Sequence, residues 1–268
     1  MQTSLSANHS WRQLLAAPAP ASHIVQLYDH DAFLETAVAH FAAEGLQRGE
    51  AVLLTGTDTH LEAICRRLGA EGVDASAAAR SGQLALSDVH EAIGLIAPQG
   101  QLDEPRFTAA TRDAIAQTLG ERRFAGLRWW GEITNTLYHR GHAEAGFRAE
   151  ELGDAAAKEL GFTIFCSFLC DRFNPQAYDG ALHTVCCQHS HVIPADDYGH
   201  HRIAVNRAIG EVVGDLRGTL LQSLASWKGV PFEAPSSQAL LFWVRDELPQ
   251  HFDAVLERTR EHLHGVAA

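Results

Sequence analysis

The sequence predicts an α/β protein with a mostly parallel sheet covered by helices on both faces, followed by a C-terminal helical hairpin. Short apolar segments of strand length alternate with segments of helix length up to about residue 195. This alternation is typical of chains that build parallel sheets from strand–helix–strand units. From about residue 200 onward only helical periodicity remains, which separates the hairpin from the α/β part.

Five segments have the length and composition of strands. Residues 51–55 form a continuous apolar run, as expected for a central parallel strand that is buried on both faces. Residues 162–168 are the strongest candidate, because aromatic and β-branched side chains favour strands. Residues 83–86 predict a second buried strand, and residues 23–28 and 127–130 complete the set.

Polar residues and glycine mark the expected helix ends. We expect Asp29 or Asp31 to cap the helix after the first strand, and Gly45 to end that helix. Thr57, Asp58 or Thr59 can cap the helix after the second strand. Asn174 and Pro175 supply a capping residue and a first-turn proline for a later helix.

We divide the chain into a flexible leader (residues 1–21), an α/β domain (22–195) and the helical hairpin (196–268). In the hairpin, apolar residues recur at spacings of three and four, close to a coiled-coil seam. The hairpin either covers the α/β core or serves dimerisation or the docking of an output partner. The seam residues are Ile209, Val213, Leu216, Leu220, Leu224 and Trp227.

Composition excludes several classes of protein. The formal net charge is −12 and no dense Lys/Arg run exists, so direct nucleic-acid binding is not expected. No apolar stretch reaches the roughly 18 residues of a transmembrane helix, so no membrane partner is expected. Five cysteines in a chain of 268 residues do not suggest a disulfide framework. We therefore expect a cytoplasmic protein.

Nine short segments carry a resemblance to a known family. They are residues 23–29, 44–46, 48–50, 52–55, 82–84, 131–132, 150–152, 165–168 and 189–190. Their order and spacing over residues 22–192 resemble the MEDS domain, the sensory module named for methanogens, methylotrophs and the dichloromethane regulator. The resemblance implies a divergent relative of the RecA-like circadian ATPases that senses small molecules such as simple hydrocarbon derivatives. Relatives often carry DNA-binding or kinase modules, which this sequence lacks, so we expect signalling through a protein partner.

Residues 54–60 stand where a RecA-like ATPase has its phosphate-binding loop. That loop needs several glycines, a lysine for the terminal phosphates and a Ser/Thr for magnesium. This segment has one glycine, no lysine, and Asp58, which would repel a phosphate. No Gly-x-Ser-x-Gly motif or kinase motif appears either. We expect the protein not to be an enzyme, and nucleotide binding without hydrolysis stays an alternative.

Ligands of open α/β sheets bind beyond the carboxyl ends of the strands. We expect a small-molecule ligand there and no tightly bound cofactor. Glu132 is the most informative residue, because a carboxylate after a strand can bind a polar ligand group, act as a base, or cap the next helix. The predicted ligand-binding residues are Tyr28, Thr55, Thr57, His60, Trp130, Glu132 and Ser167.

A cysteine and histidine cluster provides a rival hypothesis, namely a metal-sensing or redox-sensing protein. Thiolate and imidazole groups suit zinc, copper or iron. Cys166 and Cys170 are expected to share a strand face, and His183 and Cys187 a helix face. However, no Cys-x-x-Cys pair is present, so we do not predict a metal site. The cluster comprises Cys166, Cys170, His183, Cys186, Cys187, His189 and His191.

Overall fold

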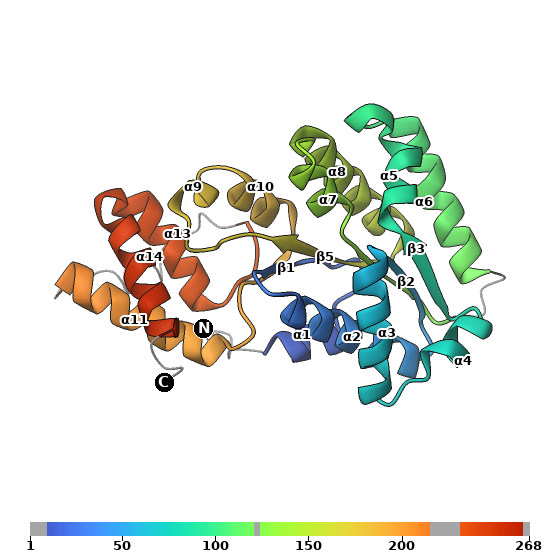
Figure 1. Ribbon diagram of the computed structural model, residues 1–268, viewed down its shortest axis with the longest axis horizontal. Helices are drawn as coiled ribbons and strands as arrows, with labels where there is room; N and C mark the ends of the chain where they lie inside the picture. Colours follow the sequence, from blue (N-terminus) through green and yellow to red (C-terminus); the bar gives the residue numbers. More distant parts are fainter. Residues whose placement is uncertain (1–9, 121–123, 215–230, 265–268) are drawn as a thin grey trace, which may run out of the picture. The chain divides into compact units, whose positions relative to one another are not determined.

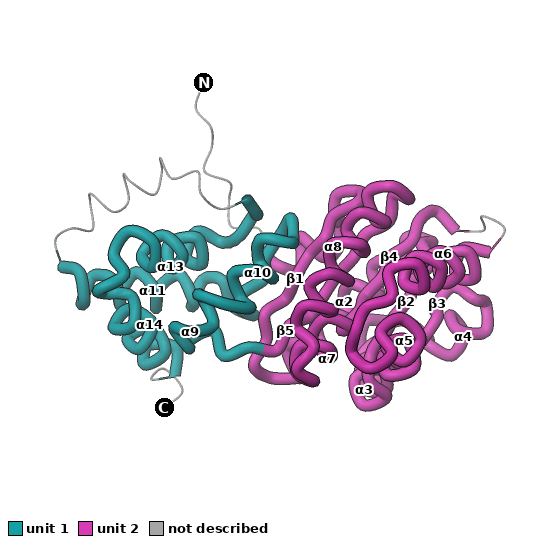
Figure 2. The backbone as a smooth tube through the Cα atoms, turned by 90° about the horizontal axis from the view of Figure 1, so that it is seen from above, with its two compact units in different colours: residues 1–10, 170–268 teal, residues 11–169 magenta. Residues whose placement is uncertain are grey.

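The computed structural model describes residues 10–120, 124–214 and 231–264. The chain forms two compact units, coloured separately in Figure 2. The α/β unit comprises Trp11–Leu169, and the C-terminal unit comprises Cys170–Ala268 together with Met1–Ser10. Residues 170–195, which we had assigned to the α/β domain, therefore group with the C-terminal helices.

The α/β unit contains five parallel strands in the order β3-β2-β4-β5-β1. This confirms the predicted fold class, and the arrangement fits a RecA-like sheet. Each strand overlaps a segment predicted from the sequence. The strands are β1 (His23–Tyr28), β2 (Ala51–Gly56), β3 (Leu84–Asp88), β4 (Leu127–Gly131) and β5 (Thr163–Leu169).

Helices cover both faces of this sheet (Figure 1). One face carries α1 (Trp11–Ala16), α2 (Asp31–Gln47) and α3 (Asp58–Ala70). The other face carries α5 (Val89–Ile96), α6 (Glu104–Leu119), α7 (Ile133–His139) and α8 (Ala143–Leu160). The connections include α4 (Ala75–Arg80) and the 3-10 turn Pro98–Gly100.

Alternation along the strands decides which helices each side chain meets, because successive side chains point to opposite faces. Trp130 and Phe165 are paired across β4 and β5, and Phe165 packs against Phe41 of α2 with ring centroids 5.2 Å apart. The neighbouring pair, Trp129 and Ile164, packs with residues of α6 and α8 on the other face. Two adjacent tryptophans of β4 thus belong to different layers of the core.

Strand β3 lies at the edge of the sheet and differs from the prediction of a strand buried on both faces. Leu84 is buried, whereas Leu86 is 47% exposed. A single neighbouring strand, β2, pairs with β3 within this unit, so an edge side chain has fewer atoms around it.

The prediction of a flexible leader is wrong for residues 11–16, which form α1. Trp11 and Leu15 are buried, and α1 packs on α2. Arg128, at the start of β4, holds the end of this helix in place. Its guanidinium donates hydrogen bonds to the backbone oxygens of Leu15 (2.7 Å) and Ala16 (3.1 Å), which would otherwise be unpaired at the end of α1.

Gly45 does not end its helix, as we had expected, since α2 continues to Gln47. Glycine is needed at this position because the Arg128 side chain leaves no room for a Cβ atom. A Cβ at position 45 would lie 2.6 Å from Cδ of Arg128, whose Nε donates a 2.5 Å hydrogen bond to Glu50. The turn after α2 is made by Gly49, whose φ is 77°.

The predicted caps are partly right. Neither Asp29 nor Asp31 caps α2, because the N-cap residue is His30 and no side chain there accepts a capping hydrogen bond. Thr57 does cap α3, since its hydroxyl accepts from the amide of His60 at 3.3 Å.

In the described part of the C-terminal unit, three longer helices, α11, α13 and α14, pack together. Its elements are α9 (Pro175–Tyr178), α10 (Ala181–Gln188), β6 (His191–Ile193), α11 (Tyr198–Val213), α13 (Ser236–Glu247) and α14 (Pro249–His264). Asn174 caps α9, as predicted. Helix α11 packs on α14 and α13, which together bury the apolar faces of all three helices.

Only the start of the predicted coiled-coil seam lies within the described residues. Helix α11 ends at Val213, and Gly214 follows with a φ of 66°. Ile209 and Val213 are buried within the chain itself. The other seam residues, Leu216, Leu220, Leu224 and Trp227, lie outside the described residues. Among the residues that the structure describes, no helix has the length and apolarity to cross a membrane.

Candidate functional site

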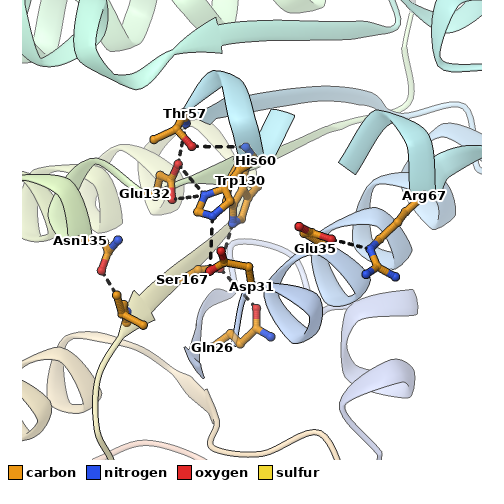
Figure 3. Close-up of polar contacts among 11 residues, drawn as sticks. Gln26, Asp31, Glu35, Thr57, His60, Arg67, Trp130, Glu132, Asn135 and Ser167 are labelled. Atoms are coloured by element: carbon orange, nitrogen blue, oxygen red, sulfur yellow. Dashed lines mark hydrogen bonds and ion pairs between the residues drawn. The ribbon is translucent and has the colours of Figure 1, made fainter. Parts of the chain in front are cut away.

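Glu132 is the centre of a polar cluster at the carboxyl ends of β2 and β4 (Figure 3). Its side chain is 1% exposed. One carboxylate oxygen, Oε1, accepts a hydrogen bond from the backbone N–H of Thr57 at 2.6 Å. His60 Nδ1 lies 2.9 Å from Oε2 and 3.1 Å from Oε1. Three of the predicted ligand-binding residues are therefore in direct contact.

Two acids surround the imidazole of His60 in this cluster. The hydrogen bond to Glu132 raises the pKa of His60 above its usual value, although partial burial opposes this shift. A second carboxylate, that of Asp31, lies 3.7 Å from His60 Nε2. The imidazole of His60 thus lies between two acids, one buried and one exposed.

A second group of polar side chains lies beside the Glu132 cluster on the α2 face (Figure 3). The indole N–H of the buried Trp130 donates to Ser167 Oγ at 3.0 Å, and Ser167 in turn donates to Gln26 Oε1 at 3.4 Å. Gly56 lies close to both groups. A Cβ at this position would lie 2.6 Å from the Trp130 ring and 3.1 Å from Glu132 Oε1.

Two predicted ligand-binding residues, Thr55 and Tyr28, are not part of the Glu132 cluster. Thr55 accepts a hydrogen bond from the indole N–H of Trp129 at 3.0 Å, so its side chain belongs to the opposite face of the sheet. Tyr28 is buried at the end of β1. A residue that we did not predict, Asn135 of α7, accepts from the backbone N–H of Leu169 at 2.9 Å and holds the end of β5 (Figure 3).

A cavity of about 100 Å³ lies between the sheet and helices α5 to α8. No local sequence pattern predicts this cavity, because its walls come from segments that are far apart in the chain. Most of its walls are apolar. The lining residues are Ala92, Ile96, Phe107, Thr111, Trp129, Gly131, Ile133, Thr134, Ala149, Glu150, Gly153, Phe162, Ile164 and Cys166.

One side of the cavity carries a buried polar group made of His23, Glu150 and Cys166. His23 Nε2 lies 3.1 Å from Glu150 Oε2 and 3.4 Å from Cys166 Sγ. The thiol lies 3.5 Å from the same Glu150 oxygen. Burial, reinforced by the nearby Glu150, raises the pKa of Cys166 to about 12, whereas His23 opposes this shift.

Asp154 supports His23 from its other side. The carboxylate oxygen Oδ1 of Asp154 lies 3.5 Å from His23 Nδ1, and Oδ2 accepts from Lys158 at 2.6 Å. This hydrogen bonding, first from His23, lowers the pKa of Asp154 to about 2. Burial alone would lower the pKa of His23, but Cys166, Asp154 and Glu150 outweigh it and raise that pKa well above its usual value.

The predicted cysteine and histidine cluster is divided between the two units. Cys166 is in β5 of the α/β unit, whereas Cys170, His183, Cys186, Cys187, His189 and His191 are in the C-terminal unit. Strand β5 ends at Leu169, so the prediction that Cys166 and Cys170 share a strand face is wrong. His183 and Cys187 do share a face of α10, with Nε2 and Sγ 3.7 Å apart.

A family model settles the relationship to known proteins. The model of MEDS, the methanogen/methylotroph, DcmR sensory domain, matches residues 22–189, which is more than half of the chain. The chain belongs to the MEDS family. No curated protein matches the chain significantly.

The MEDS match covers all five strands of the α/β unit, the Glu132 cluster and every residue that lines the cavity. It also extends into the C-terminal unit as far as His189. MEDS is a family of sensory domains, which is consistent with a sensory or regulatory role for this chain.

Proposed function

We propose that this MEDS protein is a regulatory sensor, not an enzyme, and that it binds a small, largely apolar molecule in the cavity between the sheet and α5 to α8. The observation that carries this proposal is the cavity of about 100 Å³ inside the sensory domain. Apolar cavities of about 150 Å³ bind benzene or xenon. A ligand of only a few heavy atoms is therefore the appropriate size.

The walls of the cavity favour an apolar molecule with one polar group. Trp129, Phe107 and Ile164 offer apolar contacts, whereas Glu150 and Cys166 place polar atoms at one side. Pockets of this kind use the apolar walls for affinity and a few polar atoms for orientation.

The cavity is connected to the Glu132 cluster through α7. Ile133 and Thr134 line the cavity and directly follow Glu132 in the chain. A ligand that shifts the first turn of α7 would move the carboxylate that holds Thr57 and His60 of α3. Such a ligand changes the output only if it binds one arrangement of α7 more tightly than another. In this proposal the predicted strand-end residues relay the signal.

The geometry at Thr57 supports a role without nucleotide hydrolysis. A phosphate-binding loop offers its backbone N–H groups to the phosphates. Here the N–H of Thr57 is already occupied by the carboxylate of Glu132 at 2.6 Å. A phosphate would have to displace a buried negative charge, which disfavours the alternative of a nucleotide-binding module.

The remaining parts of the proposal concern output. The protein works in the cytoplasm and passes its signal to a protein partner or through a homodimer, in which the C-terminal helices take part. The acidic net charge of −12 supports a protein partner over nucleic acid.

The experiment is cavity filling with a matched control. Gly153→Val directs its methyl groups into the cavity, since a Cβ at 153 meets only Ile164 Cδ1, at 3.7 Å. Gly94→Val makes the same change in α5, where a Cβ has nothing within 4 Å. Xenon and benzene are the probes, followed by xenon NMR and thermal unfolding.

We expect saturable binding to the native protein and to Gly94→Val. Binding to Gly153→Val should be at least tenfold weaker, which corresponds to a loss of about 1.4 kcal/mol in binding free energy. Equal binding to both variants, or no binding to the native protein, would contradict the proposal.

A further inference from the structure

We propose that His23, Glu150 and Cys166 form a binding site for a divalent transition metal ion, with zinc as the best fit. The three side chains come from β1, α8 and β5, and each is buried. They present one nitrogen, one oxygen and one sulfur atom toward a common point. This site is independent of whether the neighbouring cavity takes a ligand.

The spacing of the three donor atoms matches a tetrahedral ion. Bonds of about 2.0–2.3 Å to nitrogen, oxygen and sulfur, at tetrahedral angles, separate the ligand atoms by about 3.4–3.6 Å. The observed separations are 3.4 Å for His23 Nε2 to Cys166 Sγ, 3.5 Å for Sγ to Glu150 Oε2, and 3.1 Å for Nε2 to that oxygen. Shifts of a few tenths of an ångström would complete the geometry.

The position of Asp154 beside His23 is an independent observation that supports a metal site. Histidine ligands of metals usually place their second ring nitrogen near a carboxylate or carbonyl, which fixes the orientation of the ring. His23 Nε2 faces Glu150 and Cys166, while Nδ1 lies 3.5 Å from Asp154 Oδ1. Asp154 is in turn held by Lys158 at 2.6 Å.

The mixture of donor atoms decides the class of metal. A thiolate and an imidazole disfavour magnesium and calcium, which require oxygen ligands. One ligand each of sulfur, nitrogen and oxygen suits zinc. Glu150 and Cys166 also line the cavity, so a bound ion would lie at its wall.

The test uses the full chain, purified without a polyhistidine tag and then stripped of metal. Cobalt is titrated first, because a cobalt–thiolate bond gives a charge-transfer absorption, and zinc is then used to displace it. We expect one ion per chain and a charge-transfer band. X-ray absorption of the zinc protein should show one sulfur at about 2.3 Å and nitrogen or oxygen ligands at about 2.0–2.2 Å.

Variants assign the ligands. Cys166→Ser should remove the band, and His23→Gln and Glu150→Gln should each weaken zinc binding at least tenfold. Asp154→Asn, which leaves the three ligands in place, should weaken it by about 10–100-fold. Cys187→Ser is the matched control, because Cys187 also has a histidine nearby, at 3.7 Å.

The proposal is overturned if the stripped protein takes up no ion in a one-to-one ratio, if the zinc spectrum contains no sulfur, or if Cys187→Ser removes the band while Cys166→Ser retains it. The X-ray absorption result holds even where a variant does not fold.

Discussion

The carboxylate of Glu132 and the backbone N–H of Thr57 are joined by a 2.6 Å hydrogen bond that links the start of α7 to the start of α3. Both groups follow the carboxyl ends of neighbouring parallel strands. The bond places a buried negative charge at the positive end of a helix, which is favourable. The same carboxylate is the nearest charged neighbour of His60.

The first prediction concerns the ionisation of His60. Its pKa is raised by Glu132, with Asp31 as a further acidic neighbour. His60 therefore stabilises the fold fully below its unfolded pKa of about 6.5, and this stabilisation is lost as the pH rises through the folded pKa. Glu132→Gln should lower the pKa of His60, as measured by NMR titration. His30→Gln, which alters a side chain that is 80% exposed, is the control and should leave the His60 titration unchanged.

The second prediction has the opposite sign and concerns His201 of α11. Burial, with Arg172 and His200 as positive neighbours, lowers the pKa of His201 to about 3. The unfolded chain binds this proton more readily, so stability falls as the pH drops below about 6.5, by up to roughly 1.4 kcal/mol per pH unit until pH 3. His201→Gln should flatten this loss in urea unfolding at a series of pH values. A variant that follows the native protein at every pH would contradict it, and His251→Gln on α14 serves as the control.

The third prediction compares two glycines inside helices. Gly45→Ala places a Cβ 2.6 Å from Arg128, so we expect a loss of about 1–3 kcal/mol from overpacking. Gly69→Ala in α3 meets nothing within 4 Å and should gain up to about 1 kcal/mol from helix propensity. Thermal unfolding of the two variants should move in opposite directions. A stabilised Gly45→Ala protein would show that Arg128 can move aside.

The fourth prediction tests the connection between the cavity and the Glu132 cluster. If a ligand in the cavity moves the first turn of α7, then benzene should change the NMR signals of His60. The change should disappear in Gly153→Val and persist in Gly94→Val. Binding of benzene without any response at His60 would show that α7 does not relay the signal.

The strands of the α/β unit were predictable because each is a short apolar run that differs clearly from the helices around it. The run at residues 51–55 became β2 with every residue buried. The grouping of Thr57, His60 and Glu132 followed from one rule, namely that the carboxyl ends of parallel strands share an edge. Thr55 is not part of this group, because side-chain alternation places its side chain on the other face of the sheet.

What the sequence could not reveal depends on contacts between distant segments. His23 and Cys166 meet across neighbouring strands although 143 positions separate them. Gly45 looked like a helix end because glycine is common there, yet glycine is needed because the side chain of Arg128, from strand β4, lies beside it. In both positions tertiary packing, which leaves no local pattern, decides the role of the residue.

The two tryptophans of β4 have a practical consequence. Trp129 borders the cavity, and Trp130, one position later, is buried on the opposite face and donates its indole N–H to Ser167. Each indole is therefore a built-in fluorophore for one layer of the protein. A chain that keeps only Trp129 would report optically on the contents of the cavity, and one that keeps only Trp130 would report on the α2 layer, without any attached dye.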